Sequence, residues 1–134
     1  MAALDTNVLV RYLVQDDARQ GVQARALIVG ALNRGETLFV PITVLLELEW
    51  VLRSAYAFPK DQIIAVLAKL LSSKELVFES ESSAEVALEL YRQSKADFGD
   101  CIHIALAHAA GEAPLWTFDK AALNVQGGQL LKSV

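Results

Sequence analysis

Residues 2–7, Ala-Ala-Leu-Asp-Thr-Asn, place a short apolar segment directly before an acidic and polar turn. The apolar segment Ala2–Leu4 predicts a buried strand, and Val8–Leu13 after the turn predicts the start of a short helix. Because a strand followed by a helix is the first half of a βαβ unit, this stretch favours an α/β fold. Asp5 then lies at the carboxyl end of the first strand.

Short apolar segments and amphipathic segments alternate along the rest of the chain, which predicts parallel βαβ crossovers. We expect a central parallel sheet of roughly four to five short strands, covered by helices on both faces. Neither a repeat nor a linker interrupts this order, so a single domain over residues 1–134 is expected. The further strands are expected at Thr37–Val40, Leu76–Phe78, Leu115–Phe118 and, weakly, Leu130–Leu131. The further helices are expected at Gln20–Leu32, from Thr43 as a cap to about Tyr56, at Asp61–Leu71, from Ser82 or Ser83 through Arg92, and at Phe98–Ala110.

Composition and charge limit the class of protein. Of the 134 residues, 54% are hydrophobic and 21% are charged, which is enough for a buried core in one domain. The net charge of −4 argues against a basic surface that binds nucleic acid without specificity. A nuclease is compatible with this charge, because carboxylates that hold a metal ion are counted as negative here.

The cellular location is constrained by what the sequence lacks. The single cysteine, Cys101, excludes an internal disulfide and a cysteine-rich zinc site. No apolar run approaches the ~20 residues that cross a bilayer, and the first residues lack the basic and apolar regions of a secretory signal. We therefore expect a cytoplasmic protein that is not associated with a membrane.

Three aspartates take positions that parallel α/β folds use for function. Asp5 and Asp119 each follow an expected strand, and Asp100 lies in the first turn of the helix that begins at Phe98. The carboxyl ends of parallel strands share one edge of the sheet, where the functional crevice of such folds lies. We expect these three carboxylates to converge at that edge.

A fourth acid comes from the apolar helix after Thr43, which carries both Glu47 and Glu49. Glu49 precedes Arg53 by one helical turn, the spacing of an ion pair on a helix. Glu47 has no basic neighbour at that spacing, so a carboxylate on an apolar face needs another charge to offset its desolvation. We therefore predict that Glu47 binds a metal ion and that Glu49 pairs with Arg53.

Carboxylates gathered at one place repel one another unless a cation lies between them. Oxygen ligands of this kind select Mg²⁺ or Mn²⁺ over Zn²⁺. Such an ion activates a water for attack on a phosphodiester and neutralises charge on the phosphate. This chemistry needs neither a histidine nor a cysteine as nucleophile, so the acids alone predict a metal-dependent hydrolase.

The ordered motifs resemble the PIN-domain family, and specifically its VapC-type toxins of bacterial or archaeal toxin–antitoxin pairs. The resemblance implies a three-layer α/β/α fold and a metal-dependent endoribonuclease that acts on RNA such as transfer RNA. It also implies a homodimer and a cognate antitoxin protein that inhibits the enzyme. The motifs extend in the family's order over nearly the whole chain, and they are Leu4–Leu9, Leu46-Glu47, Asp97–Asp100 and Thr117–Asp119.

The resemblance also assigns roles to individual residues by motif position. The metal-binding and catalytic roles fall to Asp5, Glu47, Asp100 and Asp119. The residues that would support these ligands or face the phosphate are Thr6, Asn7 and Thr117. Asp97 is a fifth acid, so the third ligand could shift by one helical turn.

Each aspartate also has a purely structural interpretation. Asp97 could cap its helix, with Asp100 favoured by the helix dipole. Asp5 could form an Asx turn, and Asp119 could cap a short helix that follows it. Two other functions are also open, a PIN-like module that binds RNA or an antitoxin without catalysis, and a receiver-like phosphoacceptor domain. The receiver-like domain requires a paired acid near the first strand and a lysine in place of a late aspartate, and the sequence offers neither.

Overall fold

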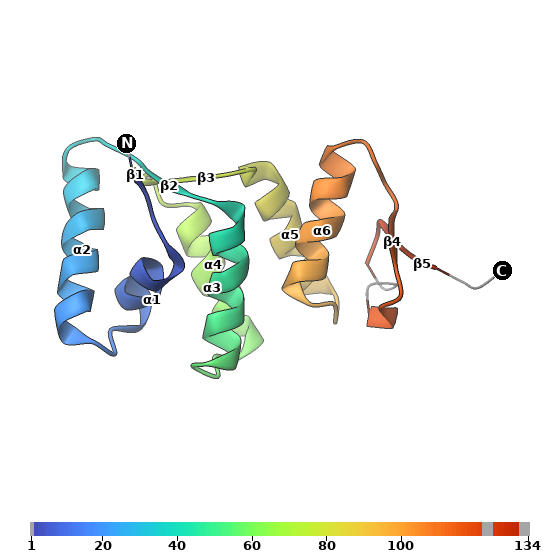
Figure 1. Cartoon of the computed structure of the whole chain (residues 1–134), viewed down its shortest axis with the longest axis horizontal. Coiled ribbons are helices and arrows are strands. Elements are labelled where there is room, and N and C mark those ends of the chain that lie inside the picture. The colour runs from blue at the N-terminus through green and yellow to red at the C-terminus, as the bar shows by residue number, and fades with distance from the viewer. Residues whose placement is uncertain (1, 122–124, 132–134) are drawn as a thin grey trace. The chain divides into compact units, whose positions relative to one another are not determined.

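The computed structural model of this chain describes residues 2–121 and 125–131. The chain divides into two units, unit 1 over Met1–Glu79 and unit 2 over Ser80–Val134, and each has its own helices and strands (Figure 1). Unit 1 contains β1 (Ala2–Ala3), α1 (Thr6–Val14), α2 (Ala18–Asn33), β2 (Leu38–Val40), α3 (Ile42–Ser54), α4 (Lys60–Leu71) and β3 (Leu76–Phe78). Unit 2 contains α5 (Glu81–Gln93), α6 (Phe98–Ala109), β4 (Leu115–Thr117) and β5 (Gly128–Leu130).

Unit 1 holds a parallel sheet with the strand order β1-β2-β3. Val40 of β2 and Phe78 of β3 are register partners, and both side chains are buried. The preceding pair, Phe39 and Val77, points to the other face because side chains alternate along a strand. These two side chains are 37% and 43% exposed, so they are less covered than Val40 and Phe78 on the opposite face.

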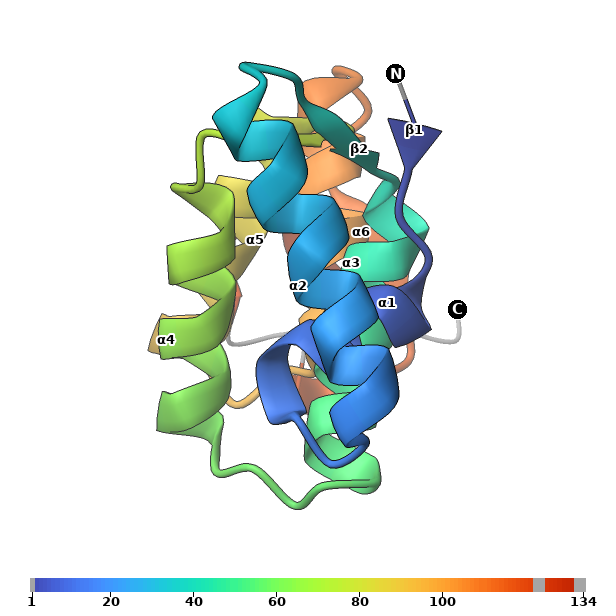
Figure 2. The same cartoon turned by 90° about the vertical axis from the view of Figure 1, so that its left-hand side faces the viewer.

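The helices of unit 1 pack on one another because each has an apolar face. α2 packs on α1, α1 on α3, and α3 on α4 (Figure 2). These contacts remove aliphatic side chains from water, which is the main favourable contribution to folding of the unit. The side chains with 0% exposure include Leu9, Leu48, Leu52, Ile63 and Leu67.

The start of α3 differs from the prediction. The helix begins at Ile42 with Pro41 at the N-cap, so the predicted cap, Thr43, is wrong and this residue lies exposed in the first turn. Proline suits the position before a helix because it fixes φ and has no N–H to satisfy. The N–H of Ile42 donates to the Glu79 carboxylate over 2.9 Å, a contact from a distant segment.

Unit 2 packs α5 against α6 and carries a two-stranded parallel sheet, β4-β5. The rings of Tyr91 and Phe98 contact each other with centroids 5.2 Å apart, which joins the end of α5 to the start of α6. α5 begins at Glu81, not at Ser82 or Ser83 as predicted. The last strand, β5, covers Gly128–Leu130, so it begins two residues before the predicted Leu130–Leu131 and shares only Leu130 with it.

The α/β class and the parallel crossovers are confirmed, because every described strand pairs in parallel with its neighbour. In the part of the chain that the structure describes, no helix is long and apolar enough to span a bilayer. β1 and β4 each lead, two residues further on, to one of the predicted site residues, Asp5 and Asp119. These two strands therefore position two of the acids described next.

Candidate metal centre

Asp5 lies at the N-cap of α1, directly after the first strand. Leu4 continues that strand by donating to the Phe39 carbonyl over 2.9 Å, and its side chain is buried, which fixes the chain just before Asp5. The Asp5 carboxylate accepts a hydrogen bond from the N–H of Thr6 over 2.7 Å. Asp5 is exposed, so the carboxylate that caps the helix is also accessible to a ligand.

Thr6 connects α1 with α3. Its side chain is buried, with 7% exposure, and its hydroxyl donates to Oε1 of Glu47 over 2.9 Å. This bond holds the Glu47 carboxylate beside the first turn of α1. Asp5, Thr6 and Glu47 therefore form one polar group in unit 1, and the exposed Asn7 follows directly after it.

The two glutamates of α3 lie in opposite environments. Glu49 is 1% exposed and pairs with Arg53 over 2.9 Å between Oε2 and Nε, which confirms the predicted ion pair. Glu47 is exposed, so the sequence argument that it is desolvated on an apolar face is wrong. Its face of the helix also carries Trp50, which is 58% exposed. Glu47 remains the candidate metal ligand of the two because its carboxylate contacts Thr6.

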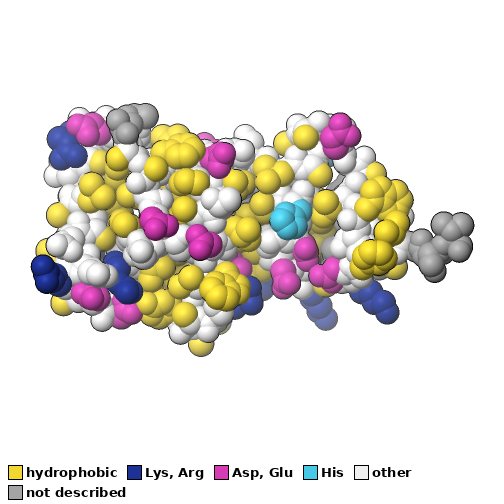
Figure 3. Space-filling view, viewed as in Figure 1, with side chains coloured by type: hydrophobic (Ala, Val, Ile, Leu, Met, Phe, Trp, Pro, Cys, Tyr) yellow, Lys and Arg dark blue, Asp and Glu magenta, His cyan; other side chains and the backbone are white. Residues whose placement is uncertain are grey.

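Unit 2 contains a group of three aspartates, Asp97, Asp100 and Asp119, which we call the acidic cluster. Each offers one carboxylate oxygen, and these oxygens all lie within 4.8 Å of one another. Asp97 is the N-cap of α6 and Asp100 lies in the first turn of that helix. Figure 3 shows acidic side chains gathered near a histidine on the surface of unit 2.

The environment of Asp100 disfavours its charged form. Partial burial, a side-chain hydrogen bond with Asp119 and the negative charges of Asp119 and Asp97 together raise the pKa of Asp100. The nearby His103 opposes this shift but does not reverse it. When burial and neighbouring negative charges raise the pKa of a carboxyl in this way, a cation would stabilise its charged form.

The turn after β4 holds Asp119 in place. The Asp119 N–H donates to the Thr117 hydroxyl over 3.0 Å, so Thr117 fixes the backbone of the turn. The Asp119 carboxylate accepts from the N–H of Ala121 over 2.9 Å, which is the capping contact that the structural interpretation expected. Asp119 therefore combines this contact with a place in the acidic cluster.

Asp97 fits its structural interpretation only in part. It occupies the N-cap position of α6, but among the described residues its side chain makes no capping hydrogen bond. The N-cap position suggested for Asp97 is therefore confirmed, whereas a capping hydrogen bond to its carboxylate is not seen in the described part of the chain. Its carboxylate lies with those of Asp100 and Asp119 instead.

The donor chemistry of both groups fits a hard divalent cation. In unit 2 the acidic cluster supplies only carboxylate oxygens, which suit Mg²⁺ or Mn²⁺. In unit 1 the carboxylates of Asp5 and Glu47 each contact Thr6. Of the acids predicted to converge, the structure thus brings together Asp100 and Asp119 in one unit, and Asp5 and Glu47 in the other. Sequence reasoning left open whether Asp97 is also a ligand.

Comparisons with known proteins match nearly the whole chain. The family model described as "PIN domain" matches residues 2–128, a range that includes every acid named above. A similar protein is the "VapC ribonuclease" of Aquifex aeolicus (strain VF5), which is 27% identical over 121 residues. The aligned region covers 90% of this chain and 88% of that protein.

Proposed function

This chain belongs to the PIN-domain family, and from that membership we propose that it is a metal-dependent endoribonuclease that hydrolyses RNA phosphodiester bonds. The family's three-layer α/β/α architecture agrees with the parallel strands and intervening helices of this chain. The similarity to a protein named as a ribonuclease over 90% of the chain supports RNA as the substrate.

The acidic cluster is the observation that carries this proposal. Three carboxylates within 4.8 Å, one of them with a raised pKa, are unfavourable for the protein alone and favourable around a dication. We propose Mg²⁺ or Mn²⁺ as the cofactor, since the ligands are all oxygen. When bound, such an ion activates water and neutralises charge on the scissile phosphate.

We propose, as the sequence predicts, that residues 1–134 form a single domain. Its metal-binding and catalytic residues would be Asp5, Glu47, Asp100 and Asp119, with Asp97 as a further ligand. Thr6 holds Glu47 and Thr117 fixes the turn of Asp119, so both act by positioning a carboxylate. Asn7 is exposed directly after Thr6, where it can face the RNA.

We also propose the biological setting from the name of the relative. The protein would act as the toxin of a toxin–antitoxin pair in the cytoplasm, as a homodimer inhibited by a cognate antitoxin protein. Transfer RNA is the substrate that we propose within this setting. The alternative function is a PIN-like module that binds RNA or an antitoxin without catalysis. It is favoured by the capping contacts of Asp5 and Asp119, which give these residues a role without metal.

An RNA digest with mapping of the product ends separates these functions. We expect the protein to cleave RNA with Mg²⁺ or Mn²⁺ and to stop when a chelator is added. Asp5→Asn should abolish cleavage, because it removes the charge while an asparagine can still cap α1. The matched control is Asp61→Asn, the same change at an exposed aspartate in the first turn of α4. Undiminished metal-dependent cleavage by Asp5→Asn would refute the proposed site.

A further inference from the structure

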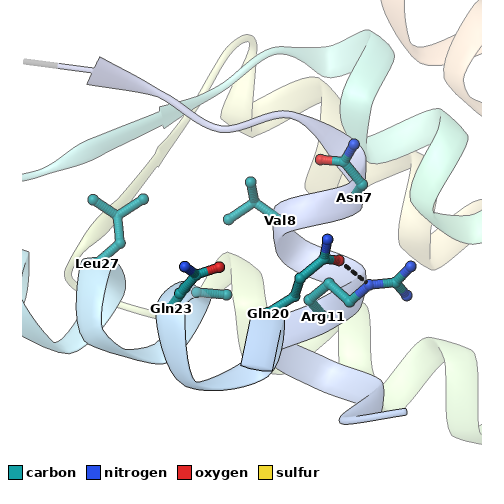
Figure 4. Close-up of a pocket in the computed structure, with 7 residues that line it drawn as sticks. Asn7, Val8, Arg11, Gln20, Gln23 and Leu27 are labelled. Carbon is teal, nitrogen blue, oxygen red and sulfur yellow. Dashed lines mark hydrogen bonds between the residues drawn. The ribbon is translucent and has the colours of Figure 1, made fainter. Parts of the chain in front are cut away.

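A hollow of about 290 Å³ lies between α1 and α2 in unit 1 (Figure 4). Its volume is close to the lower end of the range for small-molecule sites, ~300–1,000 Å³. Three side-chain amides and one cation face it above an apolar floor, and we call it the amide pocket. Its lining residues are Asn7, Val8, Arg11, Gln20, Gln23, Ala24 and Leu27.

Arg11, the cation of the amide pocket, already binds other side chains of the protein. Arg11 donates from Nε to the Gln20 side-chain oxygen over 2.6 Å, and from Nη1 to Asp16 over 3.0 Å and to the Tyr56 hydroxyl over 3.2 Å. The charge of Arg11 is therefore balanced by Asp16. A phosphate group would have to compete with that carboxylate, so the pocket favours a ligand that is polar but neutral.

The amides of the pocket can still form hydrogen bonds. The Gln20 oxygen accepts from Arg11, which leaves its NH₂ group as a donor. Within the described part of the chain, Asn7 and Gln23 have no side-chain hydrogen bond, so each offers a donor and an acceptor. Figure 4 shows the amides of Gln20 and Gln23 on α2 and that of Asn7 at the start of α1.

We propose that the amide pocket binds one unstacked nucleobase of the RNA substrate, next to the phosphodiester that is cleaved. A nucleobase presents neutral donors and acceptors on its edge and an apolar face, which match the amides and the aliphatic floor. Side-chain amides form paired hydrogen bonds with such edges, and proteins read RNA sequence mainly on unstacked bases. Asn7 follows Asp5 and Thr6 directly, so the pocket begins beside the acidic group of unit 1.

This inference rests on the proposed function and makes Gln20 and Gln23 specificity-determining residues. Its first test is the cleavage of an RNA library with random bases, read by sequencing, with kcat and KM measured on the preferred sequence. Gln23→Leu removes the amide but keeps the size of the side chain. Its matched control is Gln62→Leu, the same change at an exposed glutamine of α4 outside the pocket.

We expect Gln23→Leu to weaken the preference for one base beside the cleaved bond by roughly three- to tenfold, the effect of one neutral hydrogen bond. The loss should appear as a higher KM with kcat nearly unchanged, because the amide binds the base and does not touch the reacting atoms. Gln62→Leu should keep the natural base preference. A base profile that is the same in Gln23→Leu and in the unaltered protein overturns the proposal.

A second test is independent of cleavage and so separates this proposal from the proposed function. The side-chain NH₂ signals of Asn7, Gln20 and Gln23 are followed by NMR while adenosine, guanosine, cytidine or uridine is added without metal. We expect at least one nucleoside to shift these signals, with weaker binding to Gln23→Leu than to Gln62→Leu. If the protein cleaves no RNA but these shifts occur, the proposed function fails and the base pocket stands. If none of the nucleosides shifts these signals, the pocket does not bind bases, and a polypeptide segment becomes the better candidate.

Discussion

The hydroxyl of Thr6 donates a hydrogen bond to Oε1 of Glu47 over 2.9 Å, although 41 positions separate the two residues in the chain. The bond links the first turn of α1, which Asp5 caps, to the middle of α3. It engages one oxygen of the Glu47 carboxylate and thereby restricts the rotation of the side chain. We infer that Thr6 positions Glu47 for its proposed role as a metal ligand.

Thr6→Val tests this positioning because valine keeps the shape of threonine and removes the hydroxyl. We expect the free energy of unfolding to fall by about 1 kcal/mol, the usual effect of one lost hydrogen bond. Binding of Mn²⁺, measured by calorimetry, should weaken by roughly ten- to a hundredfold, as when the partner of a metal ligand is lost. Thr6→Ser keeps the hydroxyl and should bind Mn²⁺ nearly as well as the natural protein. Equal affinity in Thr6→Val and Thr6→Ser would show that the hydroxyl has no such role.

The two roles of Asp5 can be separated by comparing Asp5→Ala with Asp5→Asn. Both changes remove the charge, so both should abolish metal-dependent cleavage. Only Asp5→Ala removes the acceptor that the N–H of Thr6 uses, and it should lower the free energy of unfolding by about 1 kcal/mol. Asp5→Asn should unfold at nearly the same urea concentration as the natural protein. An equal loss of stability in both variants would show that the charge, and not the cap, stabilises α1.

The sequence predicts the order and type of the elements well because their apolar patterns are local. The residues of β2 and β3 alternate between buried and exposed, and α4, predicted at Asp61–Leu71, buries Ile64, Leu67 and Leu71 on one face. Strand ends then follow from the pattern, which is why Asp5 and Asp119 are found two residues after β1 and β4.

The features that the sequence does not predict depend on distant contacts. Nothing near Pro41 indicates that the Glu79 carboxylate binds the first N–H of α3. The exposure of Glu47 and the burial of Glu49 depend on which helices pack against α3, since each residue lies between two apolar residues in the sequence. Capping propensity correctly places Asp97 at the N-cap of α6, but it does not indicate that the Asp97 carboxylate lies in the acidic cluster.

The buried ion pair between Glu49 and Arg53 should matter for stability. The Glu49 side chain is 2% exposed and that of Arg53 47%, so Arg53→Met leaves a buried carboxylate with less compensation. We expect the free energy of unfolding to fall by about 2 kcal/mol, the range for a hydrogen bond to a charged group. The full penalty for a buried charge is not expected, because water can reach the position of Arg53.

The matched control for this pair is Arg92→Met. Arg92 lies 3.4 Å from Glu89, and both side chains are more than half exposed, so this pair should contribute little. Urea unfolding of the two variants gives the comparison. If Arg53→Met and Arg92→Met lose the same stability, burial of Glu49 does not determine the contribution of its ion pair.

The raised pKa of Asp100 should make the stability of the protein depend on pH. Its pKa in the folded, metal-free protein is raised above the ordinary value of 3.8 by burial and by Asp119 and Asp97. The folded state therefore holds the proton more tightly than the unfolded chain, and this contribution to stability is lost as the pH rises through the folded pKa. At neutral pH the charged Asp100 thus destabilises the metal-free protein. Asp100→Asn removes that charge, so it should unfold at a higher urea concentration than the natural protein when a chelator is present.

Metal should make the natural protein more stable than Asp100→Asn, which reverses their order in chelator. An ion that binds only the folded state stabilises it by about 2.7 kcal/mol at a concentration one hundred times its Kd. The natural protein should gain this stability with Mg²⁺ or Mn²⁺ at neutral pH, and Asp100→Asn should gain much less because it lacks one ligand. As the pH falls toward the ordinary pKa of 3.8, the advantage of Asp100→Asn in chelator should disappear, since Asp100 is then protonated in the natural protein. Equal stabilisation of both proteins by metal would mean that the acidic cluster does not bind the ion.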